Sequence, residues 1–154
     1  MKVPLTVSDF LRRGALVYPD RLALIDEPGT AGTLGTITYR SLERRARGVA
    51  IALDQLGVGH GERVAVVSPN AARFGILFYG ISGFGRVLVP INFRLARAEI
   101  DYIVRHSGAS AVFADPALRD VLPGLDVPHK FLLGDDEALY ALTIGYEKRA
   151  AQAV

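Results

Sequence analysis

The amino-acid sequence predicts an α/β protein with a doubly wound, mostly parallel sheet, flanking helices and a short β-hairpin that precedes the sheet. Two observations lead to this prediction. Short β-branched runs alternate with longer stretches whose apolar residues recur at helical spacing. The run at 63–67 leads into a nearly all-apolar helical stretch between 74 and 84, and then into a second β-branched run at 87–89. Two strands joined through a helix form a βαβ unit, whose crossover is right-handed in almost all proteins.

A single α/β domain is expected over residues 1–154. Half of the 154 residues are hydrophobic and 22% are charged, as in an ordinary globular domain with its own core. No internal repeat or low-complexity tract divides the chain.

The segment before the βαβ unit predicts a helix and a hairpin. Thr6 and Asp9 stand at the two positions of a capping box, which predicts a helix at 7–17. Apolar runs at 22–25 and 37–39 predict two strands of a hairpin. The Gly- and Thr-rich loop between them lacks the Lys-Ser/Thr ending of a phosphate-binding P-loop, so we expect a solvent-exposed loop.

Further elements follow from the same periodicities. In chain order, we expect a helix at 40–56 capped by Thr38, a helix at 98–106, a strand at 111–113, a short helix at 116–122, a strand at 130–133 and a terminal helix from Glu137. Asn70 has the right position and chemistry to cap the helix that follows the 63–67 strand. Gly80, Gly83 and Gly85 close that helix before the next strand, so we expect them to allow tight packing of the helix against the sheet.

Composition excludes several classes of site and partner. The chain has no cysteine, so disulfides, thiol nucleophiles and thiolate metal sites are absent. A net charge of only +2, with arginines spread along the chain, argues against a nucleic-acid partner. The longest apolar region contains four glycines and Arg86, which is untypical of a transmembrane segment, and no secretory signal is recognisable. We therefore expect a cytoplasmic protein.

No catalytic residue and no metal ligand can be assigned from spacing. The histidines are isolated, and no nucleophile, base and oxyanion donor come together in the sequence. In an open parallel sheet, however, ligands bind beyond the carboxyl ends of the strands. The polar residues that follow the predicted strands are Ser68, Asn70, Asn92, Arg94, Asp115, Asp135 and Asp136. Arg94 is the only fixed cation among them and can bind a phosphate through two parallel hydrogen bonds. The alternative for Arg94 is a surface ion pair with Glu99 or Asp101.

Four segments form an ordered set of motifs. Residues 38–42 (TYRSL) are similar to a core motif L-T-Y-x-E-L, and residues 81–92 (ISGFGRVLVPIN) to a motif L-K-A-G-A-x-x-V-P-L-N/D. Segments 19–25 and 56–65 match in order and spacing. Together these motifs resemble the adenylate-forming enzymes, specifically the AMP-forming acyl-CoA synthetases, over residues 6–133. In this chain Ser41 replaces the motif glutamate and Arg86 replaces a small residue.

The resemblance implies the N-terminal subdomain of the acyl-CoA synthetase fold. Such enzymes activate a fatty acid or other carboxylic acid with ATP and Mg to an acyl-adenylate, and CoA then displaces AMP. An arginine of the family's Asn-Pro-Arg-Leu segment contacts the phosphate of the CoA nucleotide. It corresponds to Arg94, with Asn92 beside it and Phe93 in place of proline. The family's phosphate loop and lysine-bearing C-terminal domain are expected beyond Val154. The chain alone is therefore expected to be inactive and to hold no cofactor tightly.

Two alternatives remain open at this point. The chain could be a standalone flavodoxin-like module that binds a nucleotide or CoA at its strand ends. It could also be an interaction module whose apolar surface forms a homodimer. The length of the acyl chain is not indicated by these residues.

Overall fold

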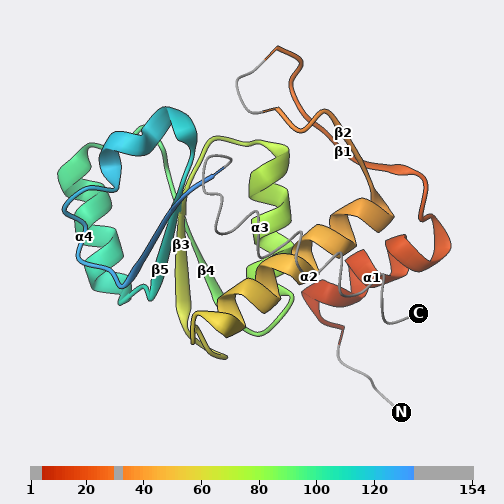
Figure 1. Cartoon of the computed structure of the whole chain (residues 1–154), viewed down its shortest axis with the longest axis horizontal. Helices are drawn as coiled ribbons and strands as arrows, with labels where there is room; N and C mark the ends of the chain where they lie inside the picture. Colours follow the sequence, from red (N-terminus) through yellow and green to blue (C-terminus); the bar gives the residue numbers. More distant parts are fainter. Residues whose placement is uncertain (1–4, 30–32, 134–154) are drawn as a thin grey trace.

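A computed structural model describes residues 5–29 and 33–133 of the chain (Figure 1). The elements in chain order are α1 (Val7–Val17), β1 (Leu22–Ile25), β2 (Thr36–Thr38), α2 (Tyr39–Gln55), β3 (Arg63–Val67), α3 (Ala72–Ser82), β4 (Val87–Ile91), α4 (Arg97–Ser107), β5 (Ala111–Ala114), the 3-10 helix η1 (Pro116–Val121) and β6 (His129–Leu132). Each helix and strand expected within these residues is present, with ends that differ by at most two residues. The helix expected from Glu137, and Asp135 and Asp136, lie outside the described residues.

Among the described residues, four strands form one parallel sheet and two form a separate antiparallel hairpin. The order in the parallel sheet is β4-β3-β5-β6, and β1 pairs with β2. Val64 of β3 lies opposite Leu88 of β4 on one side and Ala111 of β5 on the other. Because the first strand of the sheet has later strands on both sides, the chain winds in both directions from β3. This confirms the doubly wound sheet and gives the flavodoxin-like strand order.

The sheet is covered on both faces. Figure 1 shows α4 on one side of the sheet and α1, α2 and α3 on the other. Val64 and Val66 belong to the core cluster that contains residues of α1, α2 and α3, whereas Ala65 and Val67 belong to the cluster on the α4 side. Successive side chains of a strand point to opposite faces, so a strand buried on both faces needs a continuous apolar run. That requirement explains the sequence RVAVV of β3.

Two of the three predicted helix caps are present. The backbone N–H of Thr6 donates to Asp9 Oδ2 at 2.7 Å, which closes the start of α1. The N–H of Ser41 donates to Thr38 Oγ1 at 3.3 Å at the start of α2. The prediction for Asn70 is wrong, because α3 begins after Ala71 and has no cap from a neighbouring side chain.

The glycine at the middle of α3 packs against a helix and not against the sheet. A Cβ added to Gly80 would lie 2.7 Å from Val49 Cβ and 2.8 Å from the carbonyl oxygen of Ala46, and both residues belong to α2. The expectation of helix–sheet packing is therefore wrong for Gly80, which lets two helix backbones approach each other. Gly85 has φ +83° and faces the ring of His60 in the turn before β4.

Within the described part of the chain, no helix has the length and apolar character that crossing a membrane requires.

Candidate ligand-binding edge at the strand ends

The loop after β4 holds the two residues that the sequence predicts at a cofactor. Asn92 directly follows the last residue of β4, and its Oδ1 accepts a hydrogen bond from the backbone N–H of Arg94 at 3.0 Å. The N–H of Leu95 donates to the carbonyl oxygen of Asn92 at 3.2 Å. An Asn side chain that binds the backbone two residues later is an Asx turn. Asn92 therefore shapes the loop, and a contact with a ligand stays a prediction.

Arg94 is exposed on this loop. Its guanidinium carbon lies 5.4 Å from the centroid of the Phe93 ring, within the range of a cation–π contact. The alternative of a surface ion pair is wrong for the residues that the structure describes. Glu99 instead accepts a hydrogen bond from the N–H of Ala96, and Asp101 pairs with Arg105 at 2.6 Å. The guanidinium of Arg94 thus faces solvent with its fork of donors available.

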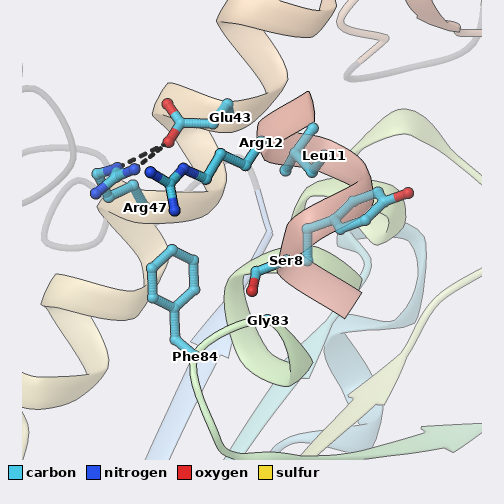
Figure 2. A pocket seen from close by; sticks show the side chains of 8 residues that line it. Ser8, Leu11, Arg12, Glu43, Arg47, Gly83 and Phe84 are labelled. Carbon is cyan, nitrogen blue, oxygen red and sulfur yellow. Dashed lines mark hydrogen bonds and ion pairs between the residues drawn. The ribbon is translucent and has the colours of Figure 1, made fainter. Parts of the chain in front are cut away.

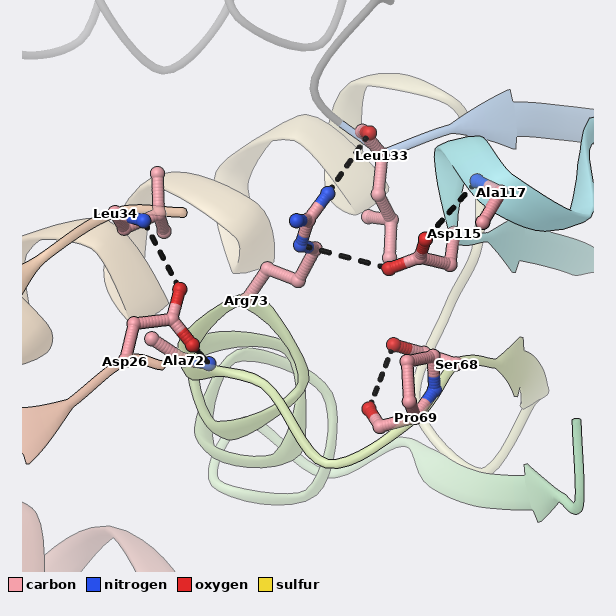
Figure 3. A network of polar contacts seen from close by, with 9 residues as sticks. All are labelled: Asp26, Leu34, Ser68, Pro69, Ala72, Arg73, Asp115, Ala117 and Leu133. Atoms are coloured by element: carbon pink, nitrogen blue, oxygen red, sulfur yellow. Dashed lines mark hydrogen bonds and ion pairs between the residues drawn. The ribbon is translucent and has the colours of Figure 1, made fainter. Parts of the chain in front are cut away.

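A second arginine, which the sequence reasoning missed, lies at the same edge. Arg73 is in the first turn of α3, and its Nε lies 3.6 Å from Asp115 Oδ2 (Figure 3). One of its terminal nitrogens donates to the carbonyl oxygen of Leu133 at 3.5 Å. The side chains of Arg73 and Asp115 are each only 9% exposed. Arg94 is the only cation among the strand-end residues selected from the sequence, and Arg73 of α3 adds a second one at this edge. An arginine in an otherwise apolar helical stretch was the signal available in the sequence.

Asp26 joins the hairpin to the start of α3. Its Oδ1 accepts a hydrogen bond from the N–H of Ala72 at 2.9 Å, and its Oδ2 accepts one from the N–H of Leu34 at 2.9 Å. Burial by itself raises the pKa of Asp26. Hydrogen bonds from Leu34, Ala72 and the Thr33 side chain, together with the charge of Arg73, outweigh burial and hold the pKa of Asp26 below its usual value. Asp26 is therefore an ionised cap supplied from a distant part of the chain.

Ser68 and Asp115 lie with Arg73 at this edge, but their polar atoms bind other groups of the protein (Figure 3). The hydroxyl of Ser68 donates to the carbonyl oxygen of Pro69 at 2.9 Å. Asp115 Oδ1 accepts a hydrogen bond from the N–H of Ala117 at 3.1 Å and caps η1. No group of three or more His, Cys, Asp or Glu side chains among the described residues could hold a metal ion. What the edge presents to a ligand is the exposed guanidinium of Arg94, which is suited to a phosphate.

Comparison with known proteins places these observations in one family. The sequence pattern of the family described as AMP-binding enzyme matches residues 11–152. The long-chain-fatty-acid–CoA ligase FadD13 of Mycobacterium tuberculosis is 41% identical over 102 residues, which are 66% of this chain and 20% of that protein. A long-chain-fatty-acid–CoA ligase of Thermus thermophilus is 32% identical over 142 residues, which are 90% of this chain and 26% of that protein.

Solved structures show the same fold. The N-terminal domain of FACL13 from Mycobacterium tuberculosis has a TM-score of 0.77 and 31% identity, over 90% of this chain and 36% of that one. A fatty acyl CoA synthetase of Mycobacterium tuberculosis has a TM-score of 0.73 and 31% identity, over 90% of this chain and 28% of that one. The chain thus spans only a fifth to about a third of the proteins that it matches. Its fold is that of the N-terminal domain of acyl-CoA synthetases, and the chain belongs to the AMP-binding enzyme family.

Proposed function

We propose that residues 1–154 form one α/β domain at the N-terminal side of an AMP-forming fatty-acid–CoA ligase. The complete enzyme would convert a fatty acid, ATP and CoA into acyl-CoA, AMP and pyrophosphate through an acyl-adenylate. One observation carries this proposal: 90% of the chain matches a long-chain-fatty-acid–CoA ligase of Thermus thermophilus, with 32% identity. The identity of the acyl chain is not part of the proposal.

Within that enzyme, the role of this chain is to support and position ligands. We assign Arg94 to a phosphate of the CoA nucleotide, because its guanidinium is exposed and can donate two parallel hydrogen bonds to phosphate oxygens. The ring of Phe93 and the Asx turn made by Asn92 restrict the positions that Arg94 can adopt. Restricting the side chain before binding lowers the entropy that is lost when the phosphate arrives. CoA itself would supply the thiol that attacks the acyl-adenylate.

The chain alone is expected to form no adenylate, because its sequence contains no Gly/Ser/Thr-rich phosphate loop of the family type. An assay of ATP–pyrophosphate exchange, with fatty acids of several lengths and Mg, tests this directly. We expect no exchange above the buffer control. Clear turnover by this chain would contradict the assignment as a non-catalytic part.

The role of Arg94 is tested by NMR titration of the chain with CoA and with pantetheine, which lacks the nucleotide phosphates. We expect CoA to shift the resonances of residues 92–94 with weak affinity and pantetheine to leave them unchanged. Arg94→Gln should weaken CoA binding about tenfold, since it removes charge-assisted hydrogen bonds. Arg105→Gln is the matched control on the neighbouring helix and should bind as the wild type does. Equal affinity of the Arg94 and Arg105 variants would overturn the assignment.

The flavodoxin-like strand order is also compatible with a second function, that of a standalone nucleotide-binding module. A standalone nucleotide-binding module should bind CoA, ATP or FMN with micromolar affinity in calorimetry, whereas a ligase segment should not.

A further inference from the structure

The strand order of the parallel sheet predicts where a nucleotide crevice would lie. After β3 the chain enters α3, whose Ile76 belongs to the core cluster on one face of the sheet. After β5 it enters η1, whose Leu118 packs against the cluster on the other face. β3 and β5 are neighbours in the sheet. In doubly wound sheets, a ligand binds beyond the carboxyl ends of two such strands, and flavodoxin-like proteins hold a flavin nucleotide there.

In this chain a buried ion pair fills that crevice. Ser68 directly follows β3 and Asp115 directly follows β5, and both are buried. Figure 3 shows Arg73 pointing from the first turn of α3 toward Asp115 and Leu133. Its Nε lies 3.6 Å from Asp115 Oδ2, and a terminal nitrogen donates to the carbonyl oxygen of Leu133, just after β6, at 3.5 Å. One guanidinium therefore lies across the carboxyl ends of β5 and β6.

Backbone groups close the same crevice. The N–H of Asp115 donates to the carbonyl oxygen of Val67, the last residue of β3, at 2.9 Å. The N–H of Leu133 donates to the carbonyl oxygen of Ala114 at 2.8 Å. Both oxygens of the Asp115 carboxylate have partners, because Oδ1 accepts from the N–H of Ala117 and Oδ2 faces the guanidinium. A ligand would have to displace these groups in order to enter.

A pocket is present beside α3, but at the opposite end of the helix. Its volume is about 490 Å³, and Figure 2 shows the Glu43–Arg47 ion pair and the ring of Phe84 at its lining. Arg73 lies about 15 Å away along a helix of this length. None of the residues that line the pocket follows a strand of the parallel sheet. Tyr79 and Phe84, which line the pocket, are therefore reference positions that a ligand of the crevice should leave unaffected.

We propose that Arg73 is a specificity-determining residue: together with Asp115 it fills the switch-point crevice and excludes nucleotides and flavins from it. A guanidinium suits this role, because its planar fork donates to a carboxylate and to a carbonyl group at the same time. Asp115 balances the charge of Arg73, so the filled crevice offers no net positive charge to a phosphate. The inference rests on the strand order and on these contacts, and it does not depend on the proposed ligase function.

Titration of the chain with FMN, followed by NMR, tests the exclusion. We expect the resonances of Ser68, Arg73 and Asp115 to be unaffected at millimolar FMN, and shifts at these residues in the wild type would overturn the proposal. The signals of residues 92–94 report separately on the Arg94 assignment, so failure of one proposal is told apart from failure of the other.

Arg73→Ala tests the filling of the crevice, since it leaves the buried carboxylate of Asp115 without its cation. We expect a lower urea midpoint, and recovery of part of that loss on addition of guanidinium ion in the millimolar range, with saturable shifts at Ser68 and Asp115. Sodium chloride at the same ionic strength should give no recovery. The wild type should bind guanidinium at least about tenfold more weakly. The absence of a saturable guanidinium effect in the variant would contradict the proposal.

The double variant Arg73→Ala/Asp115→Asn tests whether this pair is what keeps a nucleotide out. It leaves no unpaired buried charge, so it is expected to fold even where Arg73→Ala alone does not. FMN should now shift the resonance of Ser68, at an affinity at least about tenfold above that of the wild type. Arg86→Ala/Asp54→Asn is the matched control, because Arg86 is also a buried arginine paired with an aspartate but lies just before β4, at the amino ends of the strands. Equal responses of the two double variants to FMN, or no response of Ser68 in the first, would overturn the role of Arg73.

Discussion

Asp26 connects two parts of the chain that are 46 residues apart in sequence. The first backbone N–H groups of an α-helix have no partner within the helix, and a nearby side chain usually supplies the cap. In α3 the carboxylate of Asp26, just after β1, takes that role. A negative charge at a helix N-terminus is also favoured by the helix dipole. The hairpin thereby fixes the start of the helix that carries Arg73.

The lowered pKa of Asp26 leads to a prediction about pH. Because the pKa of the folded state lies below the unfolded value of about 3.9, the carboxylate contributes stability above that pH and loses it as the pH falls through the folded pKa. Asp26→Asn should lower the free energy of unfolding at pH 7 by about 1–3 kcal/mol and flatten the loss of stability that the wild type shows below about pH 5. Urea unfolding monitored by circular dichroism across this range measures both effects.

Asp20→Asn is the control for this measurement. Asp20 pairs with Arg40 at 3.2 Å, but its side chain is 83% exposed, so its removal should change stability by less than about 0.5 kcal/mol. If the Asp26 and Asp20 variants have the same stability and the same pH profile, the capping role of Asp26 is refuted.

At the scale of elements, the contact between α2 and α3 sets the distance between these two helices, which cover the same face of the sheet. Gly80 makes this contact, and its added Cβ would meet backbone and β-branched atoms that cannot move aside cheaply. Gly75 on the same helix faces only the tip of the Leu24 side chain, 3.0 Å from the added Cβ. Replacing either glycine by alanine changes the intrinsic helix propensity by the same amount, so a difference in stability between the two variants reports on packing.

Gly80→Ala should therefore destabilise the chain by about 1–3 kcal/mol, although alanine favours a helix interior. Gly75→Ala should stay within about 1 kcal/mol of the wild type, because the Leu24 side chain can shift. Urea midpoints of the two variants measure the difference. A Gly80 variant as stable as the Gly75 variant would show that α2 and α3 are not in tight contact.

At the scale of the whole molecule, stability is expected to be highest at the centre of the parallel sheet. β3 and β5 each have strands on both sides, and every residue of β5 and all but the first residue of β3 are buried. The hairpin has only two strands, and Leu22 and Ile25 are exposed at 53% and 72%. An isolated two-stranded hairpin is marginal in water and depends on what it packs against.

Native-state hydrogen exchange should consequently be slowest for the amides of Val64, Val66, Val112 and Phe113 and much faster for those of the hairpin. NMR-detected exchange in D₂O measures these rates. Hairpin amides that exchange as slowly as those of β3 would contradict this order and would place the hairpin in the same cooperative unit as the sheet.

Local patterns in the sequence determined the type and order of the elements, the two-sided burial of the parallel strands and the family motifs. The spacing of apolar residues over a short stretch of sequence indicates a strand or a helix, so this information is contained in the sequence itself. The positions of Asn92 and Arg94 at a strand end followed from the same reasoning.

The partners of particular side chains were decided only by the tertiary structure. Arg73 meets Asp115 and Leu133, which is 60 residues away, Asp26 caps a helix that Asn70 was expected to cap, and Gly80 faces α2 where the sheet was expected. The physical reason is the same in each case: a contact between segments far apart in the chain depends on how whole elements pack, and no local periodicity encodes it.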